Sequence, residues 1–167
     1  KVDSLNDHGL SALILDLRNN SGGLLRQAQM VLNLFIEKGE LVVKTRGHYS
    51  NSNREFFLEK KPVLPPDTRI AVLVNGGSAS ASEIVAGVTQ DLDRGIVVGT
   101  PTFGKGLVQN IFPLDDTSAI KITTSKYYIP SDRLIQKDGY LKNKKIVLQT
   151  RDTTTKFFSR AGRPVFE

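Results

Sequence analysis

The stretch of residues 69–84 constrains the fold of this chain more than any other. Its continuous apolar run, residues 70–74, predicts a strand buried on both faces. Two glycines, Gly76 and Gly77, end the run where the backbone can take angles that other residues resist. Apolar residues at helical spacing follow, namely Ile84, Val85, Val88 and Leu92. The stretch therefore predicts a strand, a tight turn and a helix.

Three serines, Ser78, Ser80 and Ser82, lie between this strand and this helix. A strand–turn–helix junction of small residues can expose a serine oxygen above a rigid sheet, as a nucleophile requires. Free N–H groups at the start of the helix could also stabilise an oxyanion. The alternative is structural, because Ser80 and Glu83 form the S-x-x-E pattern of a helix capping box. The turn by itself leaves both interpretations open.

A second segment, near the N-terminus, repeats this plan. Residues 11–17 predict another buried strand, and residues 18–23 form a turn rich in Asn, Ser and Gly. Residues 24–38 then predict an amphipathic helix that is closed by Gly39. A glycine turn of this kind can direct successive N–H groups at an anion, although a plain tight turn is the alternative.

The rest of the chain predicts a short helix and several more strands. The helix lies within residues 2–10, and residues 47–61 form a polar insertion. Strands are predicted over residues 41–44, 96–98, 107–114, 119–129 and 146–148. Apolar and polar residues alternate in the longest of these, as in a hairpin arm with one face in water. Strands that alternate with helices indicate the α/β class, with an antiparallel hairpin late in the chain.

Composition limits the chemistry that this chain can carry out. At 167 residues and 39% hydrophobic content, it fits one globular domain, residues 1–167. It has no cysteine, which excludes disulfides, thiolate metal sites and a cysteine nucleophile. His8 and His48 fall in predicted polar surface segments, so a catalytic serine would need a base other than histidine. No apolar run reaches the length of a membrane span.

The net charge of +6 is unevenly distributed. Between Ser118 and Pro164 there are eleven Lys or Arg residues and three Asp residues. This excess indicates either an anionic partner or a solvated face. Nucleic-acid binding is disfavoured, because the basic residues are scattered and no nucleic-acid-binding motif accompanies them.

A candidate base is the glycine-flanked lysine in Gly104-Lys105-Gly106. Gln109 comes four residues later, so a helical turn here would let its amide hold the lysine amine. A turn lysine that faces solvent is one alternative. A phosphate-binding loop is another, but Gly106 stands where that signature requires Ser or Thr. A free lysine has a pKa of about 10.4, so a lysine base must be desolvated, and burial among apolar groups such as Phe103 could supply this.

Three blocks together resemble the signature of the C-terminal processing peptidases, also called tail-specific proteases. They are residues 16–23, 77–83 and 103–109, and residues 127–136 also resemble a segment of that family. The resemblance implies a serine endopeptidase with a Ser/Lys dyad, in which Ser80 is the nucleophile and Lys105 the general base. It also implies that Gln109 orients the lysine. The implied oxyanion hole consists of backbone N–H groups of Ala81 and of the Gly22-Gly23 turn.

The resemblance also implies a crotonase/ClpP-like α/β core that uses no cofactor and no metal. Its substrates would be protein or peptide C-terminal tails, cut through an acyl-enzyme in the bacterial cell envelope (periplasmic or extracytoplasmic) or the plastid lumen. We expect residues 1–167 to be a protease core without the PDZ domain and the closing C-terminal segment of the family. Ser21 departs from the proline usual at that position. Whether the chain forms a homo-oligomer is left open.

Two functions from other classes remain as alternatives. One is a non-catalytic module that binds a ligand or peptide on the same fold. The other is a crotonase-type acyl-CoA enzyme, with which only the architecture would be shared. The joint presence of Ser80, Lys105 and Gln109 favours the protease, because a binding module has no need to retain all three.

Overall fold

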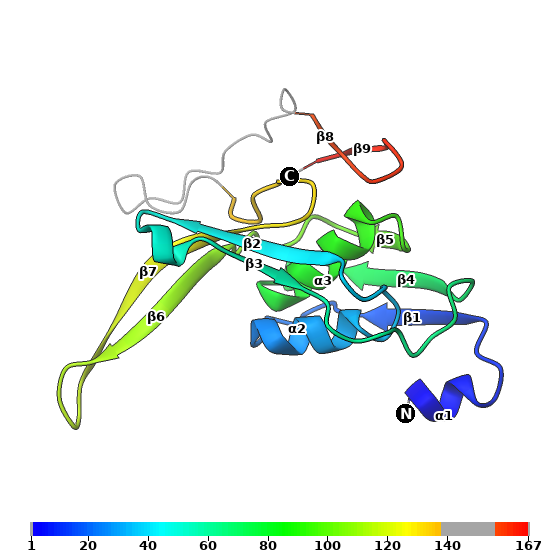
Figure 1. The fold of residues 1–167 in the computed structure, drawn as a ribbon, viewed down its shortest axis with the longest axis horizontal. Helices are drawn as coiled ribbons and strands as arrows, with labels where there is room; N and C mark the ends of the chain where they lie inside the picture. The colour runs from blue at the N-terminus through cyan, green and yellow to red at the C-terminus, as the bar shows by residue number, and fades with distance from the viewer. Residues whose placement is uncertain (1, 138–155, 167) are drawn as a thin grey trace.

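The computed structural model describes residues 2–137 and 156–166, coloured along the chain in Figure 1. Its elements in chain order are α1 (Val2–Asn6), β1 (Ala12–Asp16), α2 (Leu25–Leu32), β2 (Leu41–Gly47), η1 (Ser50–Ser52), β3 (Arg54–Phe57), β4 (Arg69–Val74), α3 (Ala81–Asp91), β5 (Ile96–Gly99), β6 (Leu107–Pro113), β7 (Ala119–Tyr128), β8 (Phe157–Phe158) and β9 (Pro164–Val165). The α/β class is confirmed. The strand predicted over residues 146–148 lies outside the described residues.

The strands β1, β4 and β5 form a parallel sheet in the order β1-β4-β5. Ala12 of β1 pairs with Arg69 of β4, and Ala71 of β4 pairs with Ile96 of β5. Because the three strands run in the same direction, the turns that follow them all leave from one edge of the sheet. Ligands and substrates of open parallel sheets bind outside this carboxyl edge.

The prediction of strands buried on both faces is wrong for this sheet. In β4, Ile70, Val72 and Val74 are buried in the main core, but the residues between them are only half-buried. In β1 no residue is buried, and Ile14 is 67% exposed. Ile96 and Val98 of β5 are exposed as well. The core therefore covers one face of the sheet, and apolar side chains remain exposed elsewhere on it.

Helix α3 is the most buried element, with nine of its eleven residues buried. It packs against α2, β2, β4 and β5. Helix α2 is shorter than predicted, since it ends at Leu32 and not at residue 38. The carbonyl of Leu34 accepts hydrogen bonds from the N–H groups of Val63 (3.0 Å) and Leu64 (2.8 Å). The returning chain thus takes an acceptor that a longer helix would have used.

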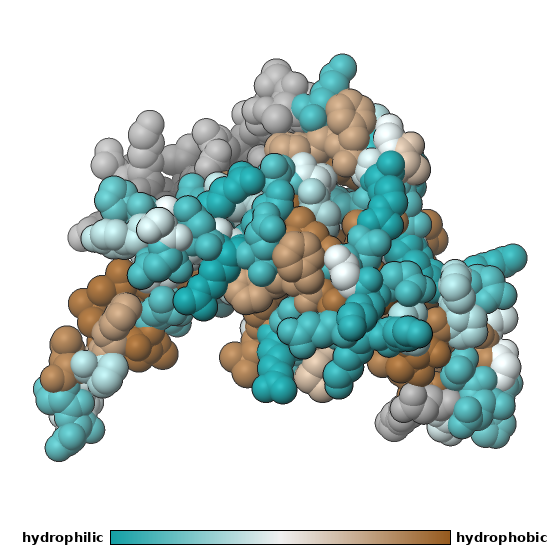
Figure 2. All heavy atoms as spheres, in the orientation of Figure 1, coloured by the Kyte–Doolittle hydropathy of each residue, from teal (hydrophilic) through white to brown (hydrophobic). Residues whose placement is uncertain are grey.

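A second, antiparallel sheet has the strand order β3-β2-β7-β6. The predicted polar insertion is therefore not purely a loop, because β3 within it pairs with β2. The predicted late hairpin is confirmed as β6 and β7, which project from the body of the molecule as an arm (Figure 1). Apolar side chains gather along this arm in Figure 2, and Ile111 is 66% exposed.

A buried ion pair joins the far end of α3 to the chain after β7. The guanidinium of Arg133 lies 2.5 Å from a carboxylate oxygen of Asp91, and their side chains are only 7% and 1% exposed. The second oxygen of Asp91 accepts a hydrogen bond from the backbone N–H of Ser131 (2.9 Å). This contact fixes residues 131–137 relative to α3. Within the part of the chain that the structure describes, no helix is both long and apolar enough to cross a membrane.

Candidate active site

Three turns meet at the carboxyl edge of the parallel sheet, one after each strand. The hydroxyl of Ser78 donates to the carbonyl of Leu17 (2.7 Å), and the N–H of Ala79 donates to the carbonyl of Asn20 (3.0 Å). The N–H of Phe103 donates to the carbonyl of Ser78 (3.0 Å). Hydrogen bonds therefore connect the turn after β4 to the turns that follow both neighbouring strands.

A pair of asparagines fixes the first two turns against each other. The amide nitrogen of Asn75 donates to the side-chain oxygen of Asn19 (3.0 Å). The side-chain oxygen of Asn75 accepts from the N–H groups of Asn19 (2.9 Å) and Gly77 (3.0 Å). Asn19 has a φ of 57°, a left-handed conformation that asparagine tolerates better than most residues. Only the turn preference of asparagine pointed to these two roles in advance.

Ser80 occupies the strained position between β4 and α3. Its φ of 56° and ψ of −115° are unusual for a residue with a side chain and cost on the order of 1–3 kcal/mol. A sharp strand-to-helix turn with this kind of strain is how other hydrolases expose a nucleophilic serine. Ser78 and Ser82 are 0% and 4% exposed, whereas Ser80 is half-buried. Of the three serines, Ser80 is therefore the accessible one.

The capping box is present, but it does not engage the Ser80 hydroxyl in a cap hydrogen bond. Its reverse half is formed, because the N–H of Ser80 donates to Oε2 of Glu83 (2.7 Å). The N–H of Glu83 itself donates to the carbonyl oxygen of Ser80 (2.9 Å). The structural and the catalytic interpretations of Ser80 are thus compatible, because the cap uses backbone atoms of Ser80.

The loop that carries Lys105 is held through four consecutive backbone N–H groups. After the bond from Phe103 to the turn, Gly104 donates to Oε1 of Glu83 (2.6 Å) and Lys105 to Oε2 of Glu83 (2.8 Å). Gly106 donates to the side-chain oxygen of Gln136 (3.0 Å). The backbones of Ser80 and Lys105, far apart in the sequence, therefore bind the same carboxylate oxygen.

The burial that a lysine base would require is not found at Lys105 in this structure. Lys105 is exposed, and Phe103, the expected apolar neighbour, is 51% exposed. The backbone hydrogen bonds of the loop hold its main chain inward and leave both side chains outside. The described residues therefore do not enclose the amine as a neutral lysine requires.

The helical turn that would let the Gln109 amide hold the Lys105 amine is not formed. Gln109 lies in β6, which pairs with β7 along its whole length, with an irregularity between Val108 and Gln109. The amide nitrogen of Gln109 lies 3.5 Å from the hydroxyl of Thr123 on β7. Gln109 therefore lies in the strand that was predicted over residues 107–114.

The three backbone groups expected in an oxyanion hole lie close together but differ in their hydrogen bonding. The N–H of Gly22 donates to the side chain of Asn20 (2.9 Å). Among the described residues, the N–H groups of Gly23 and Ala81 have no hydrogen-bond acceptor. A Cβ on Gly22, whose φ is 90°, would lie only 2.4 Å from the carbonyl oxygen of Ala79 and 2.7 Å from the nitrogen of Ala81. Glycine is required at position 22 because the two turns touch there.

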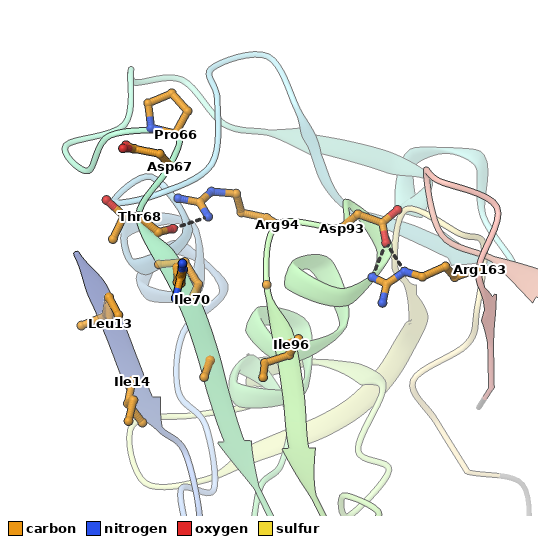
Figure 3. A pocket seen from close by; sticks show the side chains of 14 residues that line it. Leu13, Ile14, Pro66, Asp67, Thr68, Ile70, Asp93, Arg94, Ile96 and Arg163 are labelled. Atoms are coloured by element: carbon orange, nitrogen blue, oxygen red, sulfur yellow. Dashed lines mark hydrogen bonds and ion pairs between the residues drawn. The ribbon is translucent and has the colours of Figure 1, made fainter. Parts of the chain in front are cut away.

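A cavity of about 490 Å³ lies at the opposite end of the sheet, among the residues shown in Figure 3. Arg94 beside it donates to the carbonyls of Phe35 (2.7 Å) and Thr68 (2.8 Å), and burial lowers the pKa of Arg94. Arg163 pairs with Asp93. These charged groups hold chain segments together. In residues 2–137 and 156–166, no cluster of three or more acidic or His side chains could hold a metal.

Two site residues, Thr102 and Gln136, were missed from the sequence. The hydroxyl of Thr102 donates to Oε1 of Glu83 (2.7 Å). Gln136 accepts the N–H of Gly106, and a Cβ on Gly106 would lie 2.4 Å from the nitrogen of Gln136. The resemblance of residues 127–136 to a family segment was the available signal for Gln136, and Thr102 had none.

Comparison with known proteins finds a matching protein family and similar proteins over most of the chain. The family described as Peptidase family S41 matches residues 1–146. A carboxy-terminal-processing protease of Bartonella bacilliformis is 50% identical over 130 residues, which span 78% of this chain and 30% of the relative. A chloroplastic C-terminal processing peptidase of Tetradesmus obliquus is 37% identical over 81% of this chain and 28% of its own.

A solved structure of a photosystem II D1 C-terminal processing protease is similar with a TM-score of 0.71 and 35% identity, over 80% of this chain and 34% of that one. The chain therefore spans about 30% of the length of the curated relatives that it matches. The family match covers residues 1–146, which include the sequence blocks around Ser80 and Lys105 and the turns that carry them. The chain therefore belongs to peptidase family S41.

Proposed function

We propose that this chain forms the catalytic core of a serine endopeptidase that cleaves protein substrates near their C-termini. The observation that carries the proposal is the shared hydrogen-bond acceptor, Oε2 of Glu83, which brings the backbones of Ser80 and Lys105 together. The names of the relatives, which describe carboxy-terminal processing, support the choice of substrate end.

In the proposed reaction, the hydroxyl oxygen of Ser80 attacks a peptide carbonyl carbon. The neutral amine of Lys105 takes the hydroxyl proton and then gives it to the departing amine. The N–H groups of Ala81 and Gly23, which have no other acceptor among the described residues, stabilise the negative oxygen of the tetrahedral intermediate. Water, activated by the same amine, then hydrolyses the acyl-enzyme.

The proposal requires a change at Lys105, because a solvated lysine keeps its proton at neutral pH. We infer that a bound substrate or another part of the complete protein covers the exposed side chain and excludes water. The amide of Gln109, held only by the long contact with Thr123, is available to orient the amine at that stage.

The wider context of the proposal follows the family resemblance. The two sheets and α3 form a core of the crotonase/ClpP-like type, and we expect a PDZ domain elsewhere in the complete protein. We place that protein in the bacterial cell envelope or in a plastid, in keeping with relatives from a bacterium and from a chloroplast. We expect neither a cofactor nor nucleic acid to take part, and homo-oligomer formation stays open.

The test compares Lys105→Arg, Lys105→Ala and Gln109→Ala in the full-length protein, with cleavage of a tail peptide followed from about pH 5 to 10. A guanidinium stays protonated throughout, so Lys105→Arg should lose at least about 100-fold in kcat, as much as Lys105→Ala. Gln109→Ala should lose less, because it removes an orienting hydrogen bond. The wild-type rate should rise with pH, with a midpoint below the value of about 10.4 for a free lysine.

Near-wild-type cleavage by Lys105→Arg would contradict the Ser/Lys mechanism. The exposed Lys105 and the contact between Gln109 and Thr123 favour, as the second candidate, a non-catalytic module that binds peptides. That candidate gains support if the full-length protein binds a tail peptide but neither cleaves it nor reacts at Ser80 with a fluorophosphonate.

A further inference from the structure

We propose that Glu83 is the positioning residue that sets the alignment of the nucleophile and the base, an inference that rests on the proposed function. Its carboxylate accepts four hydrogen bonds, two at each oxygen. Oε1 accepts from the Thr102 hydroxyl (2.7 Å) and the Gly104 N–H (2.6 Å). Oε2 accepts from the N–H groups of Ser80 (2.7 Å) and Lys105 (2.8 Å).

A helix cap alone would need only one of these four bonds. In a capping box, the glutamate at this position reaches back to a single N–H group, which here is that of Ser80. The other three donors belong to the loop of residues 102–105, which carries the base. The carboxylate therefore connects the turn of the nucleophile to the loop of the base, which goes beyond starting the helix.

Burial of this carboxylate makes the connection rigid. Glu83 is 5% exposed, and in the described part of the chain no Lys, Arg or His forms an ion pair with it. A buried charge without a counter-ion is costly unless hydrogen bonds and dipoles replace its hydration. Four donors and the positive end of α3 supply that replacement, so the loss of any donor would be unfavourable.

Only an ionised carboxylate fits this set of donors. It offers two acceptor oxygens and no hydrogen, whereas a glutamine side chain offers one oxygen and an NH₂ group. With glutamine at position 83, the NH₂ group would therefore face hydrogen-bond donors at one of the two oxygen positions. If the NH₂ group took the position of Oε2, it would face the N–H groups of both Ser80 and Lys105.

Gln136 holds the next residue of the same loop from the other side, through the N–H of Gly106. Gln136 belongs to the segment that Arg133 and Asp91 attach to the far end of α3. The loop of the base is thus held at both ends against α3. Only the contact of Glu83 also includes the nucleophile, so Glu83 is the residue expected to set the distance between the two reacting groups.

The experiment measures kcat and KM for a tail peptide, labelling of Ser80 by a fluorophosphonate, and the thermal unfolding midpoint, all in the full-length protein. The variants are Glu83→Gln, which keeps the shape, and Glu83→Asp, which keeps the charge but is one methylene shorter. Val88→Ala is the matched control, because Val88 is a fully buried residue of the same helix that lies in the hydrophobic core.

We expect Glu83→Gln to lower kcat and the rate of labelling by about 100-fold, with KM within about threefold, because a displacement of about 1 Å between reacting groups can cost that much. Glu83→Asp should fold and still lose at least about tenfold in kcat. Val88→Ala should lower the unfolding midpoint and leave kcat within about twofold.

A wild-type kcat for folded Glu83→Gln would overturn the inference, and so would a loss of kcat in Val88→Ala equal to that in Glu83→Gln. If Glu83→Gln does not fold, the kcat of Glu83→Asp decides in the same way. If the wild-type protein shows no cleavage that depends on Ser80, the proposed function itself fails. That outcome differs from a failure of the inference, in which the wild type cleaves and the Glu83 variants cleave equally well.

Discussion

The two strand–turn–helix units of this chain follow one local plan but contribute different groups to the site. The unit of β1 and α2 has an exposed strand, and only two of the eight residues of its helix are buried. The unit of β4 and α3 has the central strand of the parallel sheet and the most buried helix. In the proposed mechanism, the first unit offers the backbone N–H of Gly23, and the second offers the side chain of Ser80.

The two turns differ because one contains a strained backbone conformation and the other contains a close approach of two chain segments. A strained serine at φ 56° persists only where the surrounding structure determines its conformation, as the turn after β4 does through Ser78, Asn75 and Glu83. The turn after β1 is mostly exposed and uses glycine where the chains approach closely. Rigid surroundings thus hold the side chain of Ser80 in place, and small residues let the backbone N–H groups approach closely.

Removal of the reacting side chain should have the largest effect. Ser80→Ala should lower peptide cleavage by the full-length protein at least about 10,000-fold, because the covalent route is lost. Cooperative unfolding should remain, because the helix cap uses backbone atoms of Ser80, which alanine keeps. Ser82→Ala, at a buried helical position, should retain measurable turnover. A dead Ser82→Ala beside an active Ser80→Ala would show that the wrong serine was chosen.

A methyl group on the turn after β1 should have the next largest effect. Gly22→Ala would place its Cβ against the backbone of Ala79 and Ala81 at a positive φ, so the two turns would have to separate. We expect a loss of about 10- to 100-fold in kcat. Gly39→Ala is the matched control, because Gly39 has the same φ of 90° as Gly22 but a Cβ there would meet nothing within 4 Å. Equal losses in both variants would argue against close contact at Gly22.

Loss of a hydrogen bond between the two turns should have a smaller effect. Ser78→Ala removes the donor to the Leu17 carbonyl and leaves that acceptor without its partner. The unfolding free energy should fall by about 1–3 kcal/mol in urea titrations. Turnover should remain measurable, because Ser78 is fully buried and takes no part in the proposed reaction. An unchanged unfolding free energy would mean that the turns are held mainly by Asn19 and Asn75.

The smallest effect is expected at the exposed start of the turn after β1. Arg18 binds the carboxylate of Asp16 (2.6 Å) and lowers the pKa of Asp16 to about 2 from 3.8. A lowered pKa favours the folded state above about pH 3.8, and this contribution is lost as the pH falls toward about 2. In Arg18→Ala, NMR titration should find the pKa of Asp16 raised toward 3.8. Peptide cleavage at neutral pH should not change, because both side chains are solvent-exposed.

Several features could be predicted from local sequence because local physics decides them. Clusters of glycine and asparagine favour turns, so the turns after β1 and β4 were placed correctly. The α/β class and the hairpin of β6 and β7 followed from the spacing of apolar residues. The choice of Ser80 came from the resemblance of its block to a family, and the burial of Ser78 and Ser82 agrees with that choice.

Other features depend on contacts between distant parts of the chain, which no local pattern reports. The chain beyond Leu32 does not continue as helix, because the carbonyl of Leu34 accepts hydrogen bonds from residues 63 and 64. The exposure of Lys105 depends on what surrounds its loop. The role of Glu83 is of this kind too: the sequence determined that a glutamate follows the serine by three residues. Only the tertiary structure decided that three more donors, from a loop about twenty residues away, would bind its carboxylate. The physical reason is that a buried charge needs hydrogen-bond partners, and the fold determines which donors lie near it.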